Sequence, residues 1–165
     1  MKTVRKTKKE RSERNVKMER KIKTLYVIHH SHTDIGYTDL QERVIDTQVD
    51  YIHTVLKMMK QPKYQDFRWN CETLFCVEEF WKEATEEEKE EFCCLASEGK
   101  IGISGSYLNF TDLLDSSIAD ERLAKWKAYF DAHHVPMKTA VIADINGISM
   151  GYRDAMLNNG VEFLF

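Results

Sequence analysis

Residues 24–37 read Thr24-Leu25-Tyr26-Val27-Ile28-His29-His30-Ser31-His32-Thr33-Asp34-Ile35-Gly36-Tyr37. The first five residues are apolar or β-forming, and they predict a short buried strand over 24–28. The polar cluster after them would then lie where this strand ends and a loop begins. Binding and catalytic residues gather at that C-terminal edge of the strands in α/β proteins. This edge is therefore the first candidate site.

His32 and Asp34 are two residues apart, and side chains at that spacing point to the same side of an extended chain. Imidazole and carboxylate groups both bind zinc, at distances of about 2.0–2.2 Å. Gly36 lets the chain turn away from the strand, and Tyr37 offers an aromatic face with a hydroxyl group. Two ligands do not complete a zinc site, so the spacing alone also fits an ordinary pair of polar surface residues.

The run 28–37 resembles the opening motif of glycoside hydrolase family 38, the α-mannosidases, whose first barrel strand ends in H-S-H-N-D-P-G-W. Three positions differ from that motif: Thr33 stands for Asn, Ile35 for Pro and Tyr37 for Trp. The resemblance implies that His32 and Asp34 are zinc ligands. It also implies that Tyr37 is the aromatic residue that packs against the bound sugar.

A second stretch is similar to the same family. The run 99–101 matches its G-Q-L/I pattern, and counting on without a gap places Asp112 on the Asp of W-V-M-x-D-E-A. In the family that Asp is both zinc ligand and catalytic nucleophile, so the resemblance implies both roles for Asp112. Leu108 and Leu113 depart from the motif. Asp115 is a nearby competitor, although it could equally cap the following helix.

Strand and helix patterns alternate along the chain. The predicted strands cover 24–28, 67–71, 101–106, 139–143 and 161–165, and the predicted helices cover 39–60, 74–84, 85–98, 120–133 and 149–159. Such alternation predicts an α/β fold with a parallel sheet. With the family resemblance, we expect a parallel-stranded (β/α) barrel-type domain that is incomplete, with about five strands.

Two further carboxylates follow predicted strands. Glu72 comes after the strand 67–71, where it could orient the site or cap the next helix, and we favour the cap. Asp144 ends the strand 139–143 and begins a run similar to the family's D-x-x-G. The resemblance therefore implies that Asp144 lines the substrate pocket.

The length of 165 residues corresponds to one domain. Residues 1–23 carry 11 Lys and Arg against 3 acidic residues, whereas the rest carries 13 basic and 24 acidic residues. We therefore expect a basic flexible tail over 1–23 and the N-terminal part of the catalytic domain over 24–165. No aromatic residues interrupt the tail's charges, so we favour a passive tail over one that binds RNA or a membrane surface.

Composition also bears on the cellular setting. No apolar run is long enough to span a membrane, and the N-terminus has no apolar core of a signal peptide. The four cysteines, Cys71, Cys76, Cys93 and Cys94, form no C-x-x-C motif. Free thiols in a reducing cytoplasm are the expected state, so we expect a cytoplasmic protein.

The chemistry that the resemblance implies is zinc-dependent, retaining hydrolysis of an α-mannoside. His32, Asp34 and Asp112 would hold the zinc, and Asp112 would attack the anomeric carbon. A second carboxylic acid about 5–5.5 Å away would protonate the leaving oxygen. The family's last zinc-binding His and its acid/base Asp match nothing over 24–165. We therefore expect a fragment of such an enzyme, with a carbohydrate substrate and a missing C-terminal half as partner.

Two other interpretations remain open. Another metal-dependent hydrolase could use the same H-x-D pair, and a third His or Asp ligand would then lie within these 165 residues. A non-catalytic remnant or partner-binding half of an α-mannosidase is the other class. In that case Asp112 would be turned away from His32 and Asp34.

Overall fold

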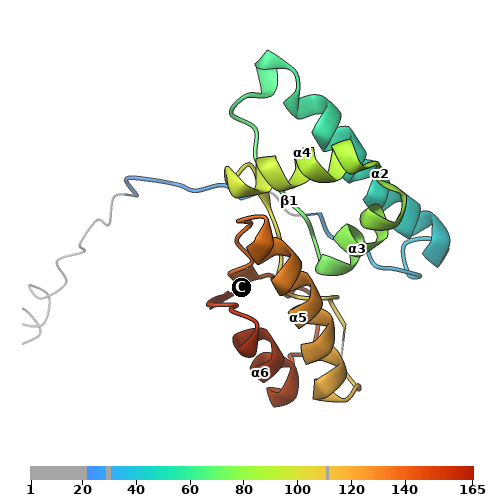
Figure 1. Ribbon diagram of the computed structural model, residues 1–165. Helices are drawn as coiled ribbons and strands as arrows, with labels where there is room; N and C mark the ends of the chain where they lie inside the picture. Colours follow the sequence, from blue (N-terminus) through green and yellow to red (C-terminus); the bar gives the residue numbers. More distant parts are fainter. Residues whose placement is uncertain (1–21, 29–30, 111) are drawn as a thin grey trace, which may run out of the picture.

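The computed structural model describes residues 22–28, 31–110 and 112–165 (Figure 1). The predicted tail over 1–23 lies almost wholly outside these described residues. The elements in chain order are α2 (Gln41–Met59), the 3₁₀ turn η1 (Pro62–Tyr64), β1 (Trp69–Asn70), α3 (Leu74–Glu83), α4 (Glu86–Ser97), β2 (Ile101–Gly102), α5 (Ser116–Ala132), β3 (Thr139–Ala140), α6 (Met150–Asn158) and β4 (Phe163–Leu164). None of the helices in the described part is long and apolar enough to cross a membrane.

The strands are short and parallel. β1 pairs with β2, and β3 pairs with β4. A single parallel bridge between Ser104 and Thr139 links the two pairs. The segment that follows β2 therefore lies between β1 and β3, with α2, α3 and α4 on one side of the strands and α5 and α6 on the other (Figure 1). Parallel pairing agrees with the alternating sequence pattern, whereas the larger barrel stays a prediction.

The helix predictions from apolar periodicity are confirmed, with small shifts at the ends. The largest shift is in α5, which begins at Ser116 instead of residue 120. Asp115 is its N-cap, because the Asp115 carboxylate accepts a hydrogen bond of 2.9 Å from the backbone N–H of Ser117. Of the two roles considered for Asp115, the structure therefore has the helix cap.

The helix α4 begins with a capping box. The Thr85 hydroxyl accepts a bond of 3.2 Å from the N–H of Glu88, and the Glu88 carboxylate accepts one of 3.0 Å from the N–H of Thr85. Glu88 also contacts His53 Nδ1 at 2.8 Å, which ties α4 to α2.

We expect Thr85→Ala to lower the free energy of unfolding by about 1 kcal/mol, because it removes the hydroxyl that satisfies a free N–H at the start of α4. Urea denaturation at neutral pH measures this change. Thr47→Ala is the matched control, since the exposed Thr47 hydroxyl bonds only the Arg43 carbonyl within α2. A Thr85→Ala chain as stable as the control would contradict the capping role.

The same contacts make the free energy of unfolding depend on pH in the acid range. A hydrogen bond from the Thr85 backbone lowers the pKa of Glu88 below its ordinary value of 4.5, burial raises it by a smaller amount, and His53 lowers it further. A carboxylate with a depressed folded pKa stabilises the fold above its unfolded pKa, and this contribution is lost as the pH falls through the folded value. We expect Glu88→Gln to lose less stability than the wild type between pH 5 and pH 3, as measured by urea midpoints.

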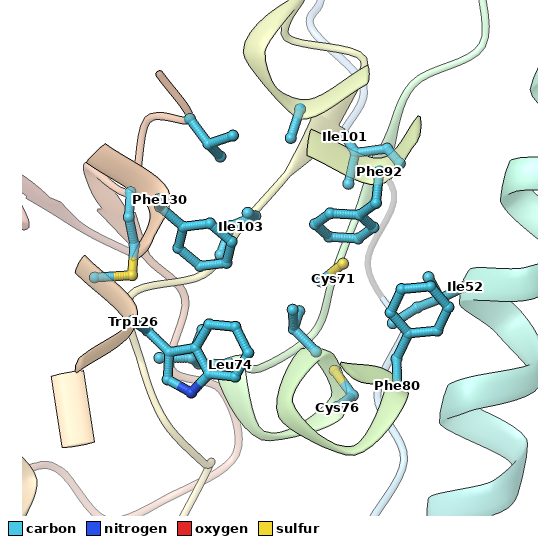
Figure 2. Packing of buried hydrophobic residues seen from close by; sticks show 14 of the residues in the cluster. Ile52, Cys71, Leu74, Cys76, Phe80, Phe92, Ile101, Ile103, Trp126 and Phe130 are labelled. Carbon is cyan, nitrogen blue, oxygen red and sulfur yellow. The ribbon is translucent and has the colours of Figure 1, made fainter. Parts of the chain in front are cut away.

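The core fills the space between the two groups of helices. Figure 2 shows Phe80, Phe92 and Ile52 on one side and Trp126 and Phe130 on the other, with residues of the strand segments between them. The largest side chains in this core with less than 2% exposure include Phe80, Phe92, Phe130, Ile52, Leu56, Leu74 and Leu123. This core fixes the strand ends from which the site loops leave.

The predicted first strand over 24–28 is wrong for the described structure. These residues form no strand, and the side chains from Leu25 to Ile28 are 77–84% exposed. Figure 1 shows the segment, in blue, running away from the helices. An apolar run predicts that a segment can be buried, but a strand also needs a neighbouring strand to pair with its N–H and C=O groups. No such neighbour pairs with this run.

Candidate functional site

The loop over 31–39 turns tightly after the exposed apolar run. The N–H of Thr38 donates to the carbonyl of Asp34 at 3.2 Å, and Gly36 has a φ of +87°. A Cβ atom at Gly36 would lie 2.9 Å from Cγ of Gln41, which is the first residue of α2. Gly36 is therefore required for its backbone conformation, and a side chain at this position would also have to displace the Gln41 side chain.

Three predicted site residues gather at this loop. His32 Nε2 lies 3.7 Å from an Asp34 carboxylate oxygen and 3.6 Å from an Asp144 carboxylate oxygen. Asp144 has a φ of +56°, a left-handed conformation that Asp tolerates better than most residues. The structure thus brings the His32 imidazole close to two carboxylates, that of Asp34 in the same loop and that of Asp144 after β3.

A cavity of about 770 Å³ opens beside this cluster. His32, Asp34, Tyr37 and Asp144 line it, and so does Asn109 from the loop after β2. The Tyr37 ring is 90% exposed. Among the described residues, the Asn109 carboxamide is buried with neither its oxygen nor its nitrogen hydrogen-bonded. Buried carboxamides normally have partners, so Asn109 is an unsatisfied polar group in the wall of the cavity.

Asp112 has a different set of partners. Its carboxylate accepts bonds of 3.0 and 3.3 Å from the backbone N–H of Ser149, the N-cap of α6. Burial raises the pKa of Asp112, but the hydrogen bonds from Ser149 outweigh this and the net shift is downward. Asp112 is not among the residues that line the cavity of His32 and Asp34.

The described residues hold no group of three or more His, Cys, Asp or Glu side chains arranged to bind a metal ion. The set predicted to bind zinc, His32, Asp34 and Asp112, is therefore brought together only in part. All four cysteines are unpaired, and three of them are buried. Burial raises the pKa of Cys71 and of Cys76. Such thiols are poor nucleophiles and poor metal ligands.

Glu72 has neither an exposed position nor the capping role that we favoured. Thr73 is the N-cap of α3, and its side chain pairs with Cys76. The buried Glu72 carboxyl group instead accepts bonds of 3.1 Å from the N–H of Thr33 and from Nε2 of Gln48. The structure thus places the Glu72 carboxyl group against the site loop and not at the helix cap.

Gln48 and Asn109 were not predicted to belong to the site. A signal for Gln48 is present in the sequence, since it lies one helical turn from both Val44 and Ile52 on the buried face of α2. A polar residue within an apolar stripe needs a buried partner. No pattern in the sequence marks Asn109, because its position depends on the loop after β2.

Comparison with known proteins supplies the family. A family model described as the glycosyl hydrolases family 38 N-terminal domain matches residues 23–151. The chain belongs to glycosyl hydrolase family 38. The match covers most of the chain, including the candidate loop and both stretches that carried the resemblance. No curated protein and no solved structure matches the chain.

Membership in family 38 makes this chain part of a glycoside hydrolase family, whose substrates are carbohydrates. The cavity agrees with such a ligand in its chemistry. It combines an exposed aromatic ring at Tyr37 with an unpaired carboxamide at Asn109 and carboxylates at Asp34 and Asp144. Sugar rings present apolar faces and many hydroxyl groups, so they need both kinds of contact.

Proposed function

We propose that this family 38 chain acts in the zinc-dependent, retaining hydrolysis of α-mannosides. The observation that carries the proposal is the arrangement of His32, Asp34 and Asp144 at the mouth of a cavity large enough for a sugar, within the residues that match the family. Zinc, the mannoside substrate and a cytoplasmic location are parts of this proposal.

The donor chemistry fits zinc. Imidazole nitrogen and carboxylate oxygen are ligands that zinc prefers. His32, Asp34 and Asp112 would hold the ion, and Asp112 would have to exchange its bond to Ser149 for the metal. Bound zinc would supply Lewis-acid contacts to the 2- and 3-hydroxyl groups of the sugar. Tyr37 would cover one face of the ring, and Asp144 would accept hydrogen bonds from its hydroxyl groups.

Asp112 would act as the nucleophile. One carboxylate oxygen would bond to the anomeric carbon while the glycosidic oxygen leaves with its electron pair. A second carboxylic acid would protonate that leaving oxygen and then activate water to release the sugar from Asp112. We assign the second acid to no residue over 24–165, and a further segment or a partner chain would supply it.

A second candidate function is carbohydrate binding without hydrolysis. The observation that favours it is the position of Asp112, whose carboxylate binds the N-cap of α6 and does not line the cavity. A chain of this kind would hold a sugar through the loop over 31–39 and would need no nucleophile. It would serve as a non-catalytic or partner-binding member of the family.

The first experiment measures zinc content and affinity of the purified chain by competition with a chromogenic chelator. We expect about one zinc ion per chain, and we expect Asp34→Ala to weaken binding by more than the roughly 10- to 100-fold typical of residues that only support a ligand. Asp39→Ala is the matched control, because Asp39 lies at the end of the same loop but pairs with Arg43 of α2. Equal, negligible zinc binding by the wild type and Asp34→Ala would exclude the zinc site.

Two further variants separate the candidate functions. If Asp112 is a zinc ligand and nucleophile, Asp112→Asn weakens zinc binding and abolishes hydrolysis of an α-mannoside. If the chain only binds sugars, Asp112→Asn leaves α-mannoside binding unchanged, whereas Asp144→Asn weakens it. Ligand-detected NMR with an α-mannoside measures the binding, and an α-glucoside is the control for specificity.

A further inference from the structure

Glu72 is a buried acidic residue that the proposed reaction does not use. Its side chain is among the least exposed polar groups of the chain, at 5%. Burying a carboxyl group is unfavourable unless hydrogen bonds replace those it made to water. Here Oε1 accepts from the backbone N–H of Thr33 and Oε2 accepts from Nε2 of Gln48, both at 3.1 Å. Both oxygen atoms therefore have a protein partner.

The three partners come from three parts of the fold. Glu72 lies between β1 and the N-cap of α3, Gln48 lies on the buried face of α2, and Thr33 lies in the site loop. The carboxyl group thus fastens the loop to two elements of the core. Its position beside the N-terminus of α3 also favours an acidic group, because the helix dipole is positive there.

Thr33 is the residue between His32 and Asp34, so its backbone fixes the direction of both side chains. A hydrogen bond to the peptide N–H acts on this backbone without touching either side chain. Residues that orient metal ligands through hydrogen bonds commonly change metal affinity when they are replaced.

We propose that Glu72 is a positioning residue, which holds the His32-Thr33-Asp34 segment in its binding geometry through the N–H of Thr33. The effect on zinc rests on the function proposed above, whereas the effect on the loop does not. Gln48 supports the same contact by occupying the second carboxyl oxygen and so fixing the rotation of the Glu72 side chain.

The zinc experiment compares Glu72→Leu and Glu72→Gln with Glu78→Gln. We expect Glu72→Leu to weaken zinc binding by about 10- to 100-fold. Glu72→Gln keeps an acceptor for Thr33, and the Gln48 carboxamide can turn to present its oxygen, so most of the affinity should return. Glu78→Gln is the control, because the Glu78 carboxylate is also largely buried but bonds Tyr107, Arg122 and Trp126. Wild-type affinity in Glu72→Leu would overturn the proposal.

A second measurement needs no zinc. Amide hydrogen exchange by NMR should show a protected Thr33 N–H in the wild type and in Glu78→Gln, and a Thr33 N–H exchanging at least tenfold faster in Glu72→Leu. Thr33 exchange that is unprotected in the wild type, or unchanged in Glu72→Leu, would overturn the positioning role. If neither the wild type nor Asp34→Ala binds zinc but Thr33 responds to Glu72, the zinc function fails and the positioning role stands. If Glu72→Leu does not fold, the exchange rate of the Thr33 N–H is measured in Glu72→Gln and in Gln48→Leu instead. Wild-type protection in both variants would overturn the positioning role.

Discussion

Phe80→Ala is expected to lower the free energy of unfolding by about 3–5 kcal/mol, among the largest effects of any single substitution in this chain. Phe80 is fully buried, and its ring lies against three other rings at the centre of the core. The ring centres are 5.0 Å from His53, 5.6 Å from Trp81 and 5.8 Å from Phe92. Truncation removes these contacts and leaves a cavity that neighbouring helices can only partly fill.

Urea denaturation followed by tryptophan fluorescence measures the change, because Trp81 and Trp126 lie in the same aromatic cluster. Phe165→Ala is the matched control, since the Phe165 side chain is 73% exposed and should contribute well under 1 kcal/mol. A loss below about 1 kcal/mol for Phe80→Ala would show that the core around α3 does not pack as described.

The helices were the most predictable part of the fold, and the reason lies in their periodicity. In α2 the buried residues Val49, Val55 and Leu56 lie three or four residues from Ile52, a spacing that a helix places on one face. Local chemistry also fixed the start of α4, because Thr85 and Glu88 satisfy each other's N–H groups whatever the rest of the chain does.

The segment over 24–28 is a case in which local composition predicts the wrong structure. Its composition is that of a buried strand, yet its side chains are exposed. Pairing is a property of two segments, and the sequence of one strand does not contain its neighbour. The same limit applies to β1 and β4, whose two-residue lengths are set by their partners and not by the five-residue patterns that predicted them.

The candidate site also has features that the local sequence predicts and features that it does not. The closeness of His32 and Asp34 follows from two-residue spacing, whereas the contact of His32 with Asp144 spans more than a hundred residues and needed the structure. Asp112 was placed by counting along a motif, which gives a position in the sequence and not a side-chain direction. Its bond to Ser149 is a contact across 37 residues that no local pattern encodes.

The Glu72 hydrogen bonds needed the structure for a related reason. The capping role that we favoured required only the next few residues, whereas the bonds to Thr33 and Gln48 span 39 and 24 residues. Burial decided between the two roles, because a capping residue can stay exposed to water and a buried carboxyl group needs both oxygens satisfied.

Glu78, on α3, makes three hydrogen bonds to other parts of the fold. Its carboxylate accepts bonds of 2.8 Å from Arg122, 3.0 Å from the Trp126 indole and 3.2 Å from the Tyr107 hydroxyl. These partners come from α5 and from the loop after β2, so one largely buried side chain connects the two groups of helices. Removing it leaves two neutral donors and a guanidinium group without their acceptor.

We expect Glu78→Ala to lower the free energy of unfolding by about 2–3 kcal/mol, below the full cost of breaking a buried ion pair because Arg122 is half exposed. Urea denaturation measures this loss. Glu78→Gln should recover part of it, because a carboxamide oxygen can still accept a hydrogen bond from Trp126. Equal losses in both variants would contradict a role for the hydrogen bonds themselves.

The charge of Glu78 has a separate effect, on the alkaline side. Burial raises the pKa of Tyr107 from 10.0 to about 12, the negative charge of Glu78 adds to this, and Arg122 opposes it. A group whose folded pKa is raised stabilises the fold fully below its unfolded pKa, and that contribution is lost as the pH rises from 10 to about 12. Glu78→Gln removes the charge but not the burial, so the pKa of Tyr107 should fall part of the way toward 10, and the loss of stability should be smaller and end at a lower pH. An NMR titration of the Tyr107 ring checks this, and an unchanged pKa in Glu78→Gln would assign the whole shift to burial.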